Sequence, residues 1–151
     1  MLVSGDDGVH ADATLDVNGG YVAVDARGDG LDINGPIRMT GGVVLVNGPT
    51  ANFNGAVDYF GSFEITGGFL VAVGSAGMAQ VLSATSTQYS VRMTLPTMQR
   101  AGTLVHVETE EGRGSSRLCR RRPASRWCSA PPIWKMAPPI LSTPGAAPPA
   151  R

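Results

Sequence analysis

Residues 29–46 read DGLDINGPIRMTGGVVLV, and this stretch sets the pattern for the whole body of the chain. It opens with an acidic glycine corner, continues as a short run of alternating apolar and polar residues, turns at Thr-Gly-Gly and ends in a second alternating run. Similar units stand on either side, at residues 7–24 and 56–73. Their Gly-Gly pairs begin at positions 19, 41 and 67, so the spacings are 22 and 26 residues. Repeats of this length are typical of solenoid proteins.

Stacking the three units in register places like residues in columns. The apolar columns are Val9, Leu31 and Val57; Leu15, Ile37 and Phe63; Val17, Met39 and Ile65; Val22, Val44 and Leu70; and Val24, Val46 and Ala72. Polar or small residues such as Asp16, Arg38 and Glu64 stand between them. Alternation of this kind is typical of strands with one face in a core and the other in solvent. The sequence therefore predicts an all-β protein built as a parallel β-helix.

A set of β-hairpins is the alternative, because Asn18-Gly19 between two alternating runs is a good hairpin turn. Hairpins do not require the same corner, strand, corner, strand order to recur with like residues in like places. Parallel stacking does require it. One turn alone cannot offset the entropy of ordering its own backbone, so each turn needs neighbours, and the ends of the coil need caps.

The net charge of zero hides two different regions. Residues 1–75 carry nine Asp or Glu against Arg27 and Arg38, whereas residues 112–151 carry eight Lys or Arg and no acid. We expect three parts: β-helix turns over 1–76, the start of a C-terminal β unit over 77–111, with strands at 86–93 and 102–108, and a tail over 112–151. No apolar run is long enough to span a membrane, and both cysteines lie in the tail.

The tail has no strand or helix period and reads as a disordered, basic, Pro-rich segment. A sharper hypothesis is a reading-frame error, because residues 133–145 read one base earlier permit an alternating β sequence after a turn. We favour the frameshift. The coil also begins inside a repeat, so we expect turns to be missing at its N-terminal end.

Two acidic columns stand out. Asp7 is predicted to stack over Asp29, and the next polar column holds His10, Asp32 and Asp58. Neighbouring strands lie about 4.8 Å apart, and two bare carboxylates at about 4 Å repel by roughly 4 kcal/mol at a protein surface. Such columns require solvent, protonation or a bridging cation. Calcium suits the last case, because it accepts several oxygen ligands in flexible geometry.

The predicted calcium ligands are Asp6, Asp7, Asp29, Asp32 and Asp58. The alternative for each residue is a corner hydrogen bond to a nearby backbone amide. Zinc is not expected, since both cysteines lie in the tail and the whole chain has only two His.

Exposed aromatic rings are candidates for ligand binding, since a ring face packs against apolar C–H surface. Tyr21, Phe69 and Tyr59 are the candidates, and Tyr21 and Phe69 share a column with Val43 between them. Covering gaps at corners is the alternative role for these rings.

Enzyme function is not expected. A polysaccharide lyase would need a base beside the calcium, and Arg27 and Arg38 are the only Arg or Lys in the body that could serve. No Ser-His-Asp set and no phosphate loop is visible. The basic tail lacks interleaved aromatic residues, so nucleic-acid binding is not expected either.

Several of these motifs together resemble a bacterial family of secreted carbohydrate-binding proteins. The matching segments are DDGVHAD at 6–12, NGG at 18–20, GDGLD at 28–32, MTGG at 39–42, VNGPT at 46–50, GSAGMAQ at 74–80 and STQYS at 86–90. The resemblance spans about residues 4–111. It implies a right-handed parallel β-helix that binds cellulose or acidic sugars such as polygalacturonate, with bound calcium, at the cell surface or after secretion. Residues 1–5 show no signal-peptide pattern, and a structural or adhesive cell-surface solenoid is the main alternative.

Overall fold

The computed structural model describes residues 1–107, 116–119 and 133–136, and the side chains of residues 1–103. Every regular element in these residues is a strand: β1 (Leu2–Ser4), β2 (Val9–Ala11), β3 (Leu15–Ala26), β4 (Leu31–Ile33), β5 (Ile37–Asn47), β6 (Val57–Tyr59), β7 (Phe63–Val73), β8 (Tyr89–Arg92), β9 (Leu104–Val107), β10 (Ser116–Cys119) and β11 (Ile133–Met136). The described part of the chain therefore has no helix with the length and hydropathy needed to cross a membrane.

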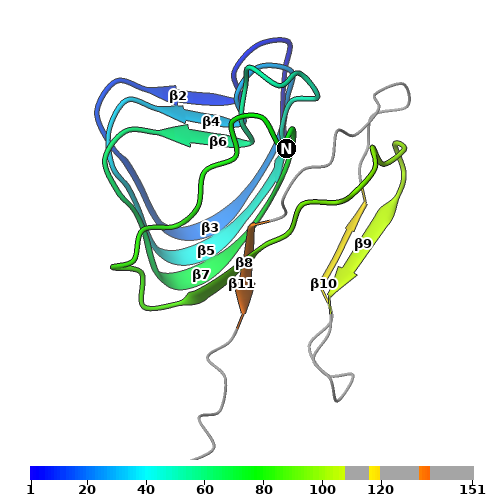
Figure 1. The fold of residues 1–151 in the computed structure, drawn as a ribbon. Helices are drawn as coiled ribbons and strands as arrows, with labels where there is room; N and C mark the ends of the chain where they lie inside the picture. The colour runs from blue at the N-terminus through cyan, green and yellow to red at the C-terminus, as the bar shows by residue number, and fades with distance from the viewer. Residues whose placement is uncertain (108–115, 120–132, 137–151) are drawn as a thin grey trace, which may run out of the picture.

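The body is a parallel β-solenoid, as the repeats predicted. Each turn contributes one short strand to a three-stranded sheet, β2-β4-β6, and one long strand to a second sheet, β3-β5-β7. All of these neighbours run parallel. Figure 1 shows the long strands curving round to face the short ones, with the core between the two sheets.

The observed register matches the predicted columns. Val9 pairs with Leu31 and Leu31 with Val57 in the short sheet. In the long sheet, Val22 pairs with Val44 and Val44 with Leu70. The parallel pairing excludes the hairpin alternative, in which neighbouring strands would run in opposite directions.

The Gly-Gly pairs differ from expectation in one respect. They lie inside the long strands, where the sequence suggested a corner between two strands. Gly20 and Gly42 have φ angles of +79° and +84°, in the left-handed region that favours glycine. The pairing shifts register beside each pair, yet the ladder continues beyond it. The strand therefore bends at the glycines and pairs with the neighbouring turns again beyond them.

The register shift also changes which residues face the core. Before the glycines of β5, Ile37 and Met39 are buried, at odd positions; after them Val44 and Val46 are buried, at even positions. The bend at Gly41-Gly42 thus keeps apolar residues inside on both halves of one long strand. The residues that are 2% exposed or less include Ile33, Phe63, Ile65 and Leu70.

The C-terminal side of the last turn is closed by residues 80–86. The backbone N–H groups of Tyr59, Phe63 and Ile65 donate to Gln80 Oε1 (2.9 Å), Ser83 Oγ (2.8 Å) and Ser86 Oγ (3.0 Å). Side chains thus satisfy N–H groups that a further turn would otherwise satisfy. Leu82 packs against the core from the same segment.

Two strands lie near the positions predicted for the C-terminal unit, β8 and β9. β11 pairs antiparallel with both β7 and β8, and β10 pairs antiparallel with β9. Most of the predicted tail over 112–151 lies outside the described residues, and β10 and β11 are its described segments.

Candidate cation site on the three-stranded sheet

The outer face of the β2-β4-β6 sheet carries a polar column. His10, Asp32 and Asp58 are the central residues of the three short strands and are directly paired in register. In β4 the flanking residues Leu31 and Ile33 are buried in the core. Because side chains alternate along a strand, the central residue of each strand points outward. The apolar flanks therefore hold three ionisable groups on one exposed face.

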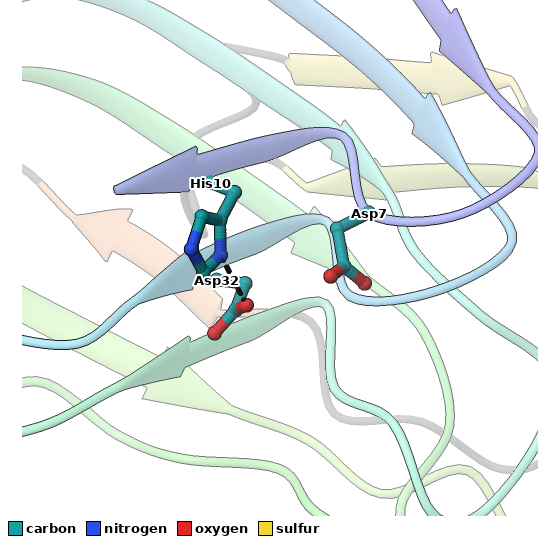
Figure 2. Close-up of side chains that lie close together, drawn as sticks. All are labelled: Asp7, His10 and Asp32. Carbon is teal, nitrogen blue, oxygen red and sulfur yellow. Dashed lines mark hydrogen bonds and ion pairs between the residues drawn. The ribbon is translucent and has the colours of Figure 1, made fainter. Parts of the chain in front are cut away.

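Asp7 lies beside this column at the preceding corner, and Figure 2 shows its carboxylate directed toward the turn that leads into β4. Asp7, His10 and Asp32 each offer one ligand atom, and these atoms lie within 4.8 Å of one another. In Figure 2 the His10 ring lies over the Asp32 carboxylate, with Nδ1 2.6 Å from Oδ2. The structure thus brings together two of the five predicted calcium ligands, Asp7 and Asp32, and adds His10.

His10 lies between two carboxylates. Its Nε2 is 3.2 Å from Asp12 Oδ1, on the other side of the ring from Asp32. The hydrogen bond to Asp32, and then that to Asp12, raise the pKa of His10 above its ordinary value. Ionised carboxylates only accept hydrogen bonds, so both contacts are satisfied at once when the ring is doubly protonated. In that state His10 is itself a cation in the column, and its nitrogens are not free to bind a metal ion.

Asp7 and Asp29 also have a structural role at the glycine corners. Asp7 Oδ1 accepts a hydrogen bond from the backbone N–H of Asp29 at 2.7 Å, and Asp29 Oδ1 accepts one from Gly55 at 2.5 Å. Each carboxylate therefore joins its own turn to the next. These are the corner hydrogen bonds that were the predicted alternative to metal binding for these residues.

The remaining predicted ligands lie outside the Asp7, His10 and Asp32 group. Asp58 Oδ1 accepts a hydrogen bond from Gln80 Nε2 at 3.2 Å. The exposed Asp6 contributes backbone contacts, with its N–H donating to Ser4 Oγ and its carbonyl accepting from Gly28. The group supplies two carboxylates, fewer oxygens than the six to eight that calcium takes, so water or a bound ligand would have to complete the shell.

The three aromatic candidates have different surroundings. Tyr21, Val43 and Phe69 are paired in one column of the long sheet, and Tyr21 is 66% exposed. Tyr59 has internal partners: its ring packs edge-to-face on Phe63 with centroids 5.7 Å apart, and its hydroxyl donates to the carbonyl of Val81 at 2.6 Å. The Tyr21 column and the acidic column belong to different sheets (Figure 1), so they do not form one flat site.

Asp29 gives a prediction that separates its hydrogen-bonding role from its charge. Burial raises the pKa of Asp29 above its ordinary value of 3.8, although the Gly55 hydrogen bond opposes this. We expect Asp29→Ala to lower the free energy of unfolding by about 1–3 kcal/mol, because the N–H of Gly55 loses its partner. Asp29→Asn keeps an acceptor oxygen and removes the partly buried charge, so it should be neutral or stabilising at pH 7.

The raised pKa of Asp29 also determines whether the stability of the fold rises or falls with pH. A raised pKa in the folded state means that the folded chain holds this proton more tightly than the unfolded chain does. The resulting stability is fully present below pH 3.8 and is lost as pH rises through the folded pKa of Asp29. The stability of Asp29→Asn relative to the natural chain should therefore increase with pH over this range. Urea unfolding at several pH values measures it, and a relative stability that falls as pH rises would contradict the assignment.

The fold and the outward column of His10, Asp32 and Asp58 together define the class of protein. It is a parallel β-solenoid with an acidic, partly hydrogen-bonded column on its three-stranded sheet. Comparisons with protein-family models, curated proteins and solved structures return no match. The function of this protein is therefore inferred from the residues described above.

Proposed function

We propose that this chain is a non-catalytic carbohydrate-binding β-solenoid that binds an acidic polysaccharide, such as polygalacturonate, with the help of calcium. The main support is the outward column of His10, Asp32 and Asp58 on consecutive strands, with Asp7 beside it. A flat face of parallel strands presents these groups at a regular spacing of about 4.8 Å. A chain of uronate sugars also carries charge at regular intervals.

Bound calcium would offset the negative charge of this face. Without a metal ion the carboxylates of Asp7, Asp32 and Asp58 repel an anionic sugar. A calcium ion held by Asp7 and Asp32 leaves most of its coordination sites open, and a uronate carboxylate is a suitable oxygen ligand for them. Polysaccharide binding is therefore expected to depend on calcium. Cellulose carries no charge, so any binding of cellulose would depend on exposed rings such as Tyr21 instead.

The test is a pull-down of the full chain on polygalacturonate and on cellulose, with calcium and with excess chelator. We expect retention on polygalacturonate only with calcium. Asp32→Asn should weaken it by at least roughly 10–100-fold, the loss that follows removal of a residue that only hydrogen-bonds to a metal ligand. Asp16→Asn is the matched control, because Asp16 is an exposed carboxylate on the long sheet. Retention that survives chelator, or equal loss in both variants, would contradict the proposal.

A structural or adhesive solenoid is the second candidate. The observation in its favour is that the carboxylates of Asp7 and Asp29 accept hydrogen bonds from backbone N–H groups of the next turn. Acidic residues in this fold therefore have a structural role that requires no ligand. The same pull-down separates the two functions, since a purely structural coil would be retained on neither sugar. Both candidates are non-catalytic and predict that no 4,5-unsaturated product forms from polygalacturonate, whereas a lyase would form it.

A further inference from the structure

The chain contains four Asn-Gly dipeptides, at 18–19, 34–35, 47–48 and 54–55. Asparagine loses its side-chain amide most readily before glycine, because glycine leaves the next backbone nitrogen unhindered. That nitrogen attacks the side-chain carbonyl carbon. The reaction therefore needs an accessible asparagine, a glycine N–H that is free of hydrogen bonds, and a backbone that can leave the extended conformation. The fold meets these requirements differently at each pair.

The last two pairs are held by hydrogen bonds of the attacking nitrogen itself. The N–H of Gly48 donates to the carbonyl of Val73 at 2.7 Å, and the N–H of Gly55 donates to Asp29 Oδ1 at 2.5 Å. Both glycines are buried. Each of these bonds joins two neighbouring turns, so deamidation at either pair must wait for a local opening between turns.

Asn18-Gly19 is restrained in another way. Both residues lie inside β3, and Asn18 Oδ1 accepts a hydrogen bond from Thr40 Oγ1 at 2.7 Å. The side-chain amide is therefore held against β5. The extended backbone of β3 must also bend before the Gly19 nitrogen can reach the side chain of Asn18.

Asn34-Gly35 lacks these restraints. The pair lies in the bend between β4 and β5 (Figure 1), and the side chain of Asn34 is exposed. The backbone N–H of Asn34 donates to the carbonyl of Ala11 at 2.9 Å. Within the part of the chain that the structure describes, neither the Asn34 side-chain amide nor the Gly35 N–H makes a hydrogen bond to another protein group. Both reacting groups are therefore unengaged at this pair.

We propose that Asn34 is a site of spontaneous deamidation in the folded chain. The Gly35 nitrogen forms a bond to Asn34 Cγ, and the side-chain nitrogen leaves as ammonia with the proton that the Gly35 N–H gives up. Water then opens the resulting succinimide ring at one of its two carbonyl carbons. The products are aspartate, or isoaspartate in which the main chain runs through the former side chain.

Both products change the corner between β4 and β5. Asn34 continues β4 as Asp12 continues β2, so the two residues lie side by side on neighbouring turns. Either product places a second carboxylate beside Asp12, and like charges on neighbouring strands repel. Isoaspartate also lengthens the main chain by a methylene next to Gly35, where even an added Cβ would overlap the carbonyl oxygen of Ala13. Deamidation thus alters the charge of this corner, and isoaspartate alters its packing as well.

Mass spectrometry of tryptic peptides from the full chain tests the proposal. Cleavage after Arg27 and Arg38 leaves Asn34 as the only amide side chain in peptide 28–38, while Asn47 and Asn54 fall in peptide 39–92. After incubation of the folded chain at mildly alkaline pH, peptide 28–38 should gain about 1 Da per deamidated molecule. We expect Asn34 to react roughly tenfold or more faster than Asn47 and Asn54, located by fragment ions, because those two require local opening first.

The same chain kept unfolded in guanidinium is the matched control. All four pairs should then react at similar rates, because the hydrogen bonds that separate them are gone. A sample digested without incubation measures the deamidation that occurs during handling. The proposal is overturned if Asn34 reacts no faster than Asn47 and Asn54 in the folded chain. It is also overturned if the unfolded chain shows the same preference, since the fold would then not select the site.

Discussion

Gly42→Ala is expected to destabilise the fold by about 2–5 kcal/mol, because a backbone-conformation penalty and a steric clash act at the same residue. The residue has a φ of +84°, which alanine adopts at a cost, and an added Cβ would lie 2.7 Å from both the carbonyl carbon and the carbonyl oxygen of Gly19 in the previous turn. Neither backbone atom can move without disturbing the ladder between β3 and β5. Urea or thermal unfolding of the full chain measures the effect.

Gly20→Ala is the matched control. Gly20 has nearly the same φ, +79°, but a Cβ there would meet nothing within 4 Å, because it belongs to the first turn. We expect it to cost only the left-handed backbone penalty, about 1–2 kcal/mol. The difference between the two variants isolates the close approach of stacked turns. Equal destabilisation by both substitutions would show that the turns do not pack at this distance.

Phe63→Ala is the second large effect. Phe63 is 2% exposed, lies in the column of Leu15 and Ile37, and packs edge-to-face against Tyr59. Truncating a fully buried Phe removes apolar burial and leaves a cavity, so we expect a loss of about 3–5 kcal/mol. The same assays as for Gly42 measure it.

Phe60→Ala is a control with the same chemistry three residues earlier. Phe60 is 79% exposed, and surface substitutions of this kind usually change stability by no more than about 0.5 kcal/mol. A large effect at Phe60 with a small one at Phe63 would mean that the inward and outward faces of this turn have been exchanged. That outcome would contradict the predicted columns as well.

The columns could be predicted because they depend on two short-range regularities. Apolar residues alternate along each strand, and the Gly-Gly pair recurs once per turn. Together they fix which residue of one turn lies beside which residue of the next, and the pairing of Val22, Val44 and Leu70 confirms it. The outward column of His10, Asp32 and Asp58 follows from the same register.

Hydrogen bonds made by single side chains could not be predicted in the same way. Gln80, Ser83 and Ser86 hold the last turn, but they do not repeat, so no periodic signal marks them. The sequence also left open whether Asp29 binds a cation or an amide; the structure shows its hydrogen bond to Gly55. The two carboxylate contacts of His10 depend on the orientation of its ring, which the spacing of residues does not reveal.

Cysteine cross-linking tests the parallel stacking most directly, in a chain whose Cys119 and Cys128 are replaced by Ser. Tyr21, Val43 and Phe69 are register partners on consecutive turns. Adjacent strands are about 4.8 Å apart, within disulfide reach, whereas strands two apart are about 9.6 Å apart and beyond it. Tyr21→Cys with Val43→Cys, and Val43→Cys with Phe69→Cys, should each form an intramolecular disulfide, and Tyr21→Cys with Phe69→Cys should not. A disulfide in the third pair, without one in the first two, would contradict the solenoid and the column on which the proposed sugar site depends.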